Sequence, residues 1–226
     1  MRVLTEYAHH TGKLAKPLKM AVVSDLHNEP FEDIFPMIEG ADLLLVPGDI
    51  TDRYRQKSES GVAFLRKAAR KLPTFYSMGN HERRQKTYDD VMKAIGQSGA
   101  EVLINRFVSF GEVCIGGWYD PEIVEVPDML DELERQPGAK VLLCHKPEWY
   151  PKYLQGRNID LIVSGHAHGG QIRLLGRGVY APGQGLLPRY TRGVEDGRMI
   201  ISAGAGNPAR MPRWGNPCEV LMITLD

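Results

Sequence analysis

Short apolar runs recur along the chain, and each is bounded by glycine, proline or a cluster of polar residues. Runs of this length are typical of strands in the core of a sheet. The final run alternates apolar and polar positions, which indicates a closing strand with one buried face. We expect strands at residues 3–8, 20–24, 43–46, 74–78, 101–104, 106–110, 112–116, 140–144, 159–164, 171–175, 198–202 and 219–225.

Between several of these runs the apolar spacing changes to that of amphipathic helices. Residues 57–71 and the leucine after them repeat apolar positions from Val62 to Leu72 at intervals of three and four. Pro73 would end this helix, because proline cannot continue the hydrogen-bond ladder. We expect further helices at residues 30–39, 86–97 and 127–136, the last with Pro127 at its start.

The order of the elements indicates the fold class. Strands and helices alternate in the first half and strands dominate the second, which predicts an α/β protein with helices layered on a largely parallel or mixed sheet. The chain of 226 residues is long enough for one well-buried domain, and it contains no repeat or low-complexity linker. We therefore expect a single domain over residues 1–226.

Composition narrows the function classes. The chain carries 28 Lys+Arg and 28 Asp+Glu, so no overall field draws it to nucleic acid or to an anionic membrane. Its cysteines, Cys114, Cys144 and Cys218, are odd in number and lack CxxC spacing, which argues against a disulfide framework or a cysteine zinc site. No run has the length of a signal-peptide core at the N-terminus or of a bilayer span. These features predict a cytoplasmic protein.

Side chains with metal-binding chemistry follow five of the expected strands. Ligands in open α/β sheets gather at the carboxyl ends of strands, so we expect these side chains to meet at one edge. Chance is a poor explanation for five such coincidences. The residues are Asp25, His27, Asp49, Asn80, His145, His166 and His168.

The last pair lies in the segment GHAHGGQ, residues 165–171. Glycines allow a tight turn and close approach of a ligand, and two histidines two positions apart in an extended segment can direct both rings to one point. Taken alone, the segment is equally compatible with a pair of inert loop histidines. The other strand-end residues favour the metal interpretation.

This ligand set has a recognisable chemistry. Mixed carboxylate, amide and imidazole ligands suit manganese, iron or zinc better than magnesium or calcium. Seven ligands are too many for one tetrahedral site and suit two metals that share a carboxylate, for which Asp49 is the natural bridge. Two ions about 3.5–4 Å apart can hold a bridging hydroxide and clamp both oxygens of an in-line phosphoryl displacement.

The same residues fall in ordered blocks: D-x-H at 25–27, GDITDR at 48–53, GNHE at 79–82, the lone His145 and GHAH at 165–168. This ordered set, over roughly residues 20–170, resembles the calcineurin-like metallophosphoesterases. The resemblance implies a four-layer α/β sandwich with two mixed sheets packed face to face and helices outside. Residues 165–193 also resemble a bacterial phosphodiesterase-type branch that includes UDP-2,3-diacylglucosamine pyrophosphatases.

The resemblance also implies roles for individual residues. His81 matches the catalytic histidine, which would stabilise phosphoryl oxygens or protonate the leaving alkoxide without binding metal. Asp52 and Glu82 would orient ligands. Manganese is the expected ion, with iron, zinc or nickel as alternatives. One metal would be held by Asp25, His27, Asp49 and His168, and the other by Asp49, Asn80, His145 and His166.

Arginines after the ligand-bearing turns are candidate phosphate contacts. We single out Arg53 in GDITDR and Arg83 after GNHE, with solvated surface charge as the alternative. Trp118 and Tyr119 either stack on a substrate or pack in the core. Further arginines that can serve are Arg55, Arg84, Arg173, Arg177, Arg189 and Arg192.

We expect hydrolysis of a small-molecule or lipid-linked phosphodiester, with a metal-bridging hydroxide as nucleophile and His81 assisting the leaving group. A phosphomonoesterase, a nucleotide or nucleotide-sugar pyrophosphatase, or a nuclease can use the same site, although zero net charge disfavours a nuclease. A non-catalytic protein-binding scaffold is the remaining alternative. It is disfavoured because every expected ligand position is filled. Residues 186–190 (LLPRY) and 211–214 (MPRW) can contact a membrane surface weakly.

Overall fold

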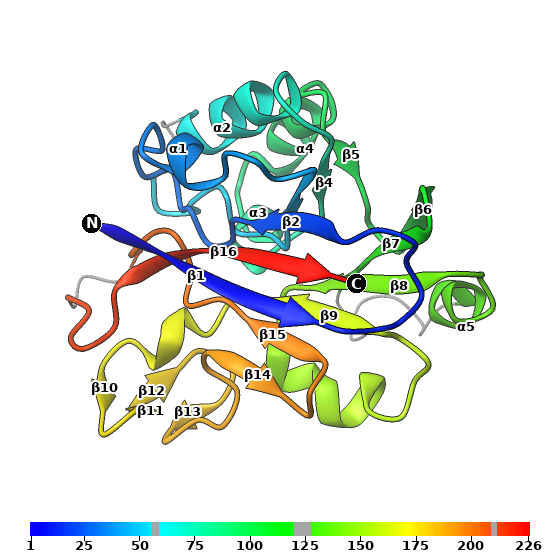
Figure 1. The fold of residues 1–226 in the computed structure, drawn as a ribbon. Coiled ribbons are helices and arrows are strands. Elements are labelled where there is room, and N and C mark those ends of the chain that lie inside the picture. The colour runs from blue at the N-terminus through cyan, green and yellow to red at the C-terminus, as the bar shows by residue number, and fades with distance from the viewer. Residues whose placement is uncertain (56–58, 120–127, 209–211) are drawn as a thin grey trace.

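The computed structural model describes residues 1–55, 59–119, 128–208 and 212–226 of the chain, which fold around two six-stranded mixed sheets (Figure 1). In the first sheet a parallel block from β2 to β5 is joined through β16, antiparallel to β2, to the edge strand β1. Its strands, in spatial order, are β1 (Arg2–His9), β16 (Cys218–Leu225), β2 (Leu18–Val22), β3 (Leu43–Val46), β4 (Thr74–Tyr76) and β5 (Glu101–Val102).

The second sheet has a parallel centre with an antiparallel strand at each edge. Its strands, in spatial order, are β14 (Gly193–Glu195), β15 (Met199–Ile201), β9 (Leu161–Ser164), β8 (Ala139–Cys144), β7 (Val113–Trp118) and β6 (Arg106–Phe110). Two small hairpins follow β9, namely β10 (Arg173–Leu174) with β11 (Arg177–Gly178) and β12 (Tyr180–Ala181) with β13 (Gly185–Leu186).

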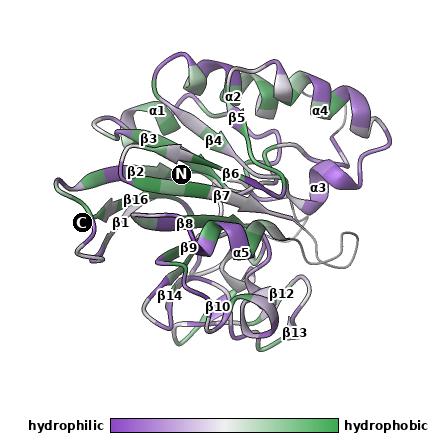
Figure 2. Ribbon diagram, turned by 90° about the vertical axis from the view of Figure 1, so that its right-hand side faces the viewer, coloured by the Kyte–Doolittle hydropathy of each residue, from purple (hydrophilic) through white to green (hydrophobic). Residues whose placement is uncertain are grey.

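Helices cover the outer faces of both sheets. Helices α1, α2 and α4 lie on the first sheet, whereas α5 and the turns η1 and η2 lie on the second (Figures 1 and 2). Figure 2 shows the alternation of hydrophilic and hydrophobic positions along α2 and α4. The helices and turns are α1 (Ile34–Met37), α2 (Ser60–Ala69), α3 (Asn80–Arg83), α4 (Tyr88–Gly96), α5 (Asp128–Glu134), η1 (Pro147–Trp149), η2 (Tyr150–Leu154) and η3 (His168–Gly170).

Continuous apolar runs produce this layering because the central strands are buried on both faces. Along β3, Leu43 and Leu45 pack between the two sheets, while Leu44 and Val46 pack under the helices. β8 has the same arrangement, with Leu143 between the sheets and Leu142 under α5. The fold is therefore the expected α/β sandwich of two mixed sheets flanked by helices.

The boundaries of several elements differ from the sequence prediction. The strand expected at 20–24 leaves the sheet after Val22, and the helix expected at 30–39 is a single turn, Ile34–Met37. The extended segment expected at 171–175 forms the hairpin β10–β11, turned at Gly176 with φ 79°. Pro127 and residues 56–58 lie outside the described residues. No helix among the described ranges combines the length and apolarity needed to cross a membrane.

Leu143 tests the packing between the sheets, because it is fully buried and lies beside Gly117 and Val163 on the neighbouring strands. Leu143→Ala should lower the free energy of unfolding by about 2–5 kcal/mol, since it removes buried methyl groups and leaves a cavity. Urea denaturation measures this change. Leu4→Ala, at a side chain that is 41% exposed, is the control, and an equal effect of both variants would contradict this assignment.

Candidate metal centre

The turns that follow five strands meet at one edge of the sandwich, and backbone hydrogen bonds continue beyond the strands to hold them in register. The Asp25 and His27 N–H groups donate to the carbonyls of Gly48 (3.0 Å) and Asp49 (3.1 Å). On the second sheet, the Gly165 N–H donates to the His145 carbonyl at 3.1 Å. The strand ends thus bring together residues that are far apart in the sequence.

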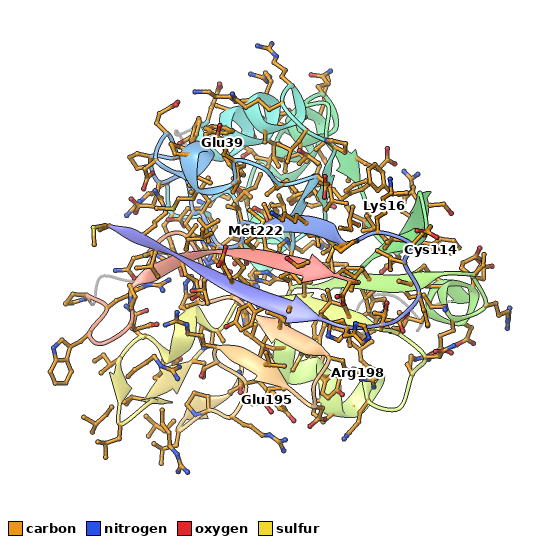
Figure 3. The ribbon with its side chains drawn as sticks, in the orientation of Figure 1. Lys16, Glu39, Cys114, Glu195, Arg198 and Met222 are labelled. Carbon is orange, nitrogen blue, oxygen red and sulfur yellow. The ribbon has the colours of Figure 1, made fainter. Side chains whose placement is uncertain are left out.

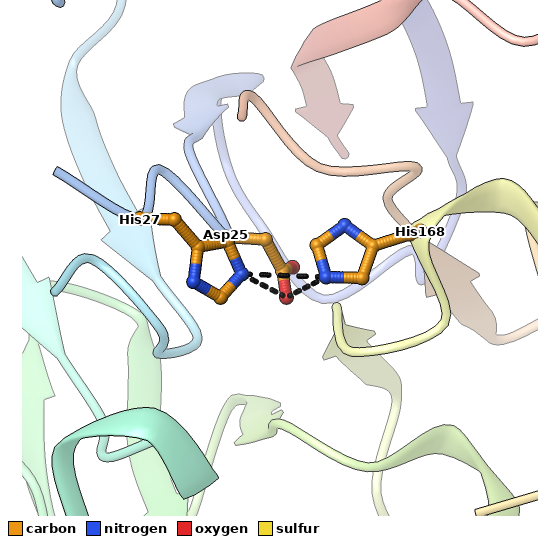
Figure 4. A group of neighbouring side chains, drawn as sticks. All are labelled: Asp25, His27 and His168. Atoms are coloured by element: carbon orange, nitrogen blue, oxygen red, sulfur yellow. Dashed lines mark hydrogen bonds and ion pairs between the residues drawn. The ribbon is translucent and has the colours of Figure 1, made fainter. Parts of the chain in front are cut away.

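Asp25, His27 and His168 form the first group of candidate ligands (Figure 4). The Nε2 atoms of the two histidines face each other at 3.3 Å. Asp25 Oδ1 lies 3.8 Å from His27 Nε2 and 3.6 Å from His168 Nε2. All three side chains are buried, and their ligand atoms converge on one point.

Asp49, His145 and His166 form the second group. His145 Nε2 lies 3.2 Å from Asp49 Oδ2, and the His145 and His166 ring centroids are 5.0 Å apart. The other ring nitrogen of His145, Nδ1, lies 3.0 Å from the Pro47 carbonyl, so it carries the proton and donates. This leaves Nε2 as the free ligand atom, the arrangement that orients metal-binding histidines.

Asp49 lies between the two groups. Its Oδ2 is 3.9 Å from His27 Nε2 of the first group and 3.2 Å from His145 Nε2 of the second. Its other oxygen, Oδ1, accepts the His81 N–H at 2.7 Å. One carboxylate therefore reaches both groups while its backbone is held in place.

His81 lies beside the first group and is oriented by a carboxylate. Its Nδ1 is 3.2 Å from Asp52 Oδ1, and its ring meets the His27 ring edge to face at a centroid distance of 4.4 Å. His27, Asp52 and His81 also have ligand atoms close enough to hold an ion. The position of His81 is thus compatible with a catalytic role and with a ligand role.

Glu82 fastens the turns after β3 and β4 to each other. Its buried carboxylate accepts the N–H groups of Asp49 (2.9 Å), Gly79 (2.9 Å) and Thr51 (2.8 Å). Burial and the nearby negative charge of Asp49 raise the pKa of Glu82. A buried acceptor that is shared by several backbone donors sets the separation of two ligand-bearing turns.

Glycines permit this close approach of the turns. A Cβ on Gly79 would lie 2.1 Å from Asp49 Oδ1, and a Cβ on Gly165 would lie 2.2 Å from Asp25 Oδ2. Both contacts are far inside van der Waals distance, so no larger residue fits without moving a candidate ligand. The glycines of the GNHE and GHAH blocks are therefore required by packing.

The candidate ligands themselves have unusual backbone conformations. Left-handed φ angles in non-glycine residues cost about 1–3 kcal/mol each and cluster at functional sites. Asparagine tolerates this region better than the others. Among the residues of these turns, positive φ occurs at Asp25 (53°), His27 (51°), Asn28 (58°), Asp49 (53°), His166 (67°) and His168 (47°).

Burial and charge divide the histidines into two kinds. Burial lowers the pKa of His168 to about 3, and burial together with the charge of His145 lowers the pKa of His166. Burial lowers the pKa of His145, but the negative charge of Asp49 outweighs burial and raises this pKa to about 9. His166 and His168 are therefore neutral at pH 7, as ligands must be, whereas metal binding at His145 would release a proton.

A further observation supports metal binding by the candidate ligands. Asn80 Oδ1 is buried without a hydrogen-bond partner among the residues that the structure describes. Buried polar atoms are normally satisfied, so the unpaired lone pairs of this oxygen are available to a cation. Asn80, at the first turn of α3, thus joins the other candidate ligands by its chemistry.

Three residues at the site carry no signal in the sequence. Arg213 Nη2 lies 3.0 Å from His168 Nδ1, and Glu148 Oε1 lies 3.5 Å from His166 Nε2. Tyr54 is exposed with its ring centroid 5.9 Å from that of His81. Arg213 and Glu148 come from segments outside the recognised blocks, so only the fold reveals their place.

The arginines proposed as phosphate contacts have different surroundings. Arg53 stacks over the Tyr54 ring at 4.6 Å and bonds its hydroxyl, next to His81. Arg83 is exposed, with its guanidinium 5.1 Å from the Tyr88 ring centroid. Trp118 is fully buried against Trp149, so its role is core packing and not substrate stacking.

Glu82→Gln tests the fastening of the two turns. An amide would present an NH₂ group to backbone donors, so we expect the free energy of unfolding to fall by about 1–3 kcal/mol and metal occupancy to fall with it. Denaturant unfolding and elemental analysis of the purified protein measure the two effects. Glu39→Gln, at an exposed position, is the matched control, and unchanged stability in Glu82→Gln would contradict the assignment.

Comparisons with known proteins agree with this geometry. An uncharacterized metallophosphoesterase of Helicobacter pylori J99 is 28% identical over 232 residues, covering 94% of this chain and 59% of that protein. Bacillus subtilis YpbG is 28% identical over 234 residues, covering 96% and 86%. A Danio rerio transmembrane protein with a metallophosphoesterase domain is 25% identical, covering 69% and 41%. The chain thus spans about three fifths of the length of the first curated relatives it matches.

Two solved structures share the fold. Haemophilus influenzae NAD nucleotidase has a TM-score of 0.50 and 17% identity, covering 68% of this chain and 39% of that one. Thermus thermophilus sulfate thiohydrolase SoxB has a TM-score of 0.50 and 15% identity, covering 83% and 52%. The sequence profile of the calcineurin-like phosphoesterases matches residues 18–170, the range that carries both groups of candidate ligands. On this match, the chain belongs to the calcineurin-like phosphoesterase family.

Proposed function

We propose that this protein hydrolyses phosphodiesters in a metal-dependent reaction. The observation that carries the proposal is the meeting of two three-residue ligand groups through Asp49, with His81 beside them. Family membership supports a metal-dependent phosphoester hydrolase. The preference for diesters over monoesters is the finer part of the proposal. It rests on the resemblance of residues 165–193 to phosphodiesterase-type proteins.

Two divalent ions would occupy the site, with Asp49 shared between them. When bound, such ions neutralise phosphate charge and activate water for attack on phosphorus. The imidazole-rich ligand set favours manganese, with iron, zinc or nickel as alternatives. In this proposal one ion is held by Asp25, His27, Asp49 and His168, and the other by Asp49, Asn80, His145 and His166.

His81 supplies the proton to the leaving alkoxide. Burial opposes protonation, but the hydrogen bond to Asp52 and the charge of Asp49 raise the pKa of His81. Asp52 therefore favours the imidazolium form of His81 and holds Nδ1, so that Nε2 is the nitrogen available to the substrate. A positioned general acid of this kind contributes about 10²–10⁴-fold to the rate.

Arg53 and Tyr54 form the polar and aromatic side of the approach to His81. The stacked guanidinium can contact a phosphate oxygen, and Tyr54 is 72% exposed, which leaves its ring free to meet a leaving group. Arg83, close after His81 in α3, is the second proposed phosphate contact. These side chains orient a diester and perform no bond-breaking step.

Hydrolysis of bis-p-nitrophenyl phosphate and p-nitrophenyl phosphate tests the proposal. Protein stripped of metal and then given manganese should cleave the diester faster than the monoester, and Asp49→Ala should abolish both metal retention and turnover. Faster cleavage of the monoester would replace the diesterase assignment by a phosphatase. Normal turnover by Asp49→Ala would contradict the site itself.

The pH profile tests the role of His81. Since the folded-state pKa of His81 is raised by Asp52, the acid form survives to higher pH than in a free imidazole. Asp52→Asn removes that charge, so the alkaline limb of the kcat/KM profile should move to lower pH. His81→Asn should lower kcat by about 10²–10⁴-fold with both metals retained. Loss of metal in His81→Asn would show that His81 is a ligand.

A further inference from the structure

Apolar side chains are exposed around the two hairpins that follow the candidate metal centre. Figures 1 and 2 both place β10, β12 and β13 together at the lower end of the molecule, remote from α2. Val179 joins the two hairpins, because its N–H donates to the Ile172 carbonyl and its carbonyl accepts from the Leu187 N–H, both at 2.9 Å. We define the hairpin surface by its exposed apolar residues, Leu174, Leu175, Tyr180, Leu186, Leu187 and Trp214.

Two of these leucines sit where folding alone would favour another residue. Leu175 is 96% exposed at φ 50°, and Leu187 is 78% exposed at φ 52°. Bulky residues avoid the left-handed region, which suits glycine and asparagine. An exposed leucine in this conformation gains nothing from packing and stores strain, so its presence points to a use outside the folded chain.

An arginine-lined pocket lies between the β10–β11 hairpin and the segment that follows β13. The pocket has a volume of about 450 Å³, and its charged lining residues are Arg173, Arg177, Arg189, Arg192 and one carboxylate, Glu195. Residues 170–193 contain these four arginines and no aspartate or glutamate, although the whole chain has zero net charge. Positive charge is thus concentrated at one place, beside the exposed leucines.

The pocket keeps uncompensated positive charge. Arg192 pairs with the buried Glu219 at 2.5 Å, and Arg189 lies 3.5 Å from Glu195, which is labelled in Figure 3. By contrast, Arg173 donates to the Gly169 carbonyl and to Thr191 Oγ1, neither of which carries charge.

Arg177 is exposed and makes no ion pair with any residue that the structure describes. Within the described ranges, Arg173 and Arg177 therefore form no ion pair with a carboxylate. Guanidinium groups bind phosphate oxygens in a fork-like geometry, so the pocket suits a phosphate group.

The hairpin surface is continuous with the metal centre. Arg173 donates to Gly169 at 2.9 Å, one residue after the candidate ligand His168. From the other side, Trp214 pairs with Ile172, and its neighbour Arg213 contacts His168 Nδ1 at 3.0 Å. A partner seated on the hairpins is thus held next to the site.

We propose that the hairpin surface docks this protein on a membrane that carries anionic lipids. Leu175 and Leu187 enter the boundary of the acyl chains, and the arginine pocket receives a lipid phosphate at headgroup depth. Apolar tips combined with basic side chains are the chemistry of peripheral membrane attachment. The proposal does not depend on the reaction at the metal centre, because docking needs neither metal nor turnover.

Sedimentation with phosphatidylcholine vesicles, with and without phosphatidylglycerol, tests the proposal. The protein should bind the anionic vesicles, and added salt should weaken that binding because it screens the arginines. Leu175→Asn with Leu187→Asn should lower the partition coefficient by about tenfold for each leucine. Asparagine suits the left-handed backbone, so this variant should be at least as stable as the parent in thermal unfolding.

Arginine variants separate the electrostatic contribution to vesicle binding from the apolar contribution. Arg177→Ala should weaken binding to anionic vesicles by about fivefold and leave binding to neutral vesicles unchanged. Arg66→Ala, at an exposed position on α2, is the matched charge control. Leu4→Asn on β1 is the matched apolar control, and neither control should reduce binding.

Three results would overturn the proposal. The first is failure of the protein to sediment with anionic vesicles. The second is equal sedimentation of the leucine variant and Leu4→Asn. The third is saturable calorimetric binding of glycerol phosphate at the arginine pocket without any vesicle binding, which would assign the pocket to a free phosphate compound. Phosphodiesterase assays on bis-p-nitrophenyl phosphate remain independent of all three outcomes.

Discussion

The candidate site depends on one buried carboxylate. Glu82 accepts backbone N–H groups from Asp49, Thr51 and Gly79, and so joins the turn after β3 to the turn after β4. Each of those donors would otherwise be buried without a partner, at a cost of about 1–3 kcal/mol. The carboxylate thus holds two turns together from outside the set of candidate ligands.

Strain in the ligand turns is offset by the packing beneath them. Asp25, Asp49, His166 and His168 all have left-handed backbone angles, which an isolated turn would not keep. The strands that precede these turns are buried on both faces, so the strand ends cannot shift to relieve the strain. Rigid strands and glycine-permitted contacts together hold the side chains in a fixed arrangement around a small volume.

The segment after β9 connects two surfaces of different chemistry. Its first part, around His166 and His168, belongs to the candidate metal centre, and its continuation forms the arginine pocket and the exposed leucines. The hydrogen bond from Arg173 in the pocket to the Gly169 carbonyl links the two parts. In the proposed arrangement, a phosphoester at a lipid surface would lie close to the metal centre, because the docking surface adjoins the candidate ligands.

Local sequence patterns predict the order of strands and helices and the candidate ligand residues. Apolar periodicity and polar residues at strand ends can both be recognised in short stretches of sequence. Tertiary structure alone decided that Arg213 and Glu148 approach the candidate ligands His168 and His166, since contacts between distant segments leave no local pattern. It also decided that Trp118 packs inside the core, because an aromatic residue after a strand suits either environment. The short hairpins β10 to β13 depend on glycine turns whose pairing only the assembled fold selects.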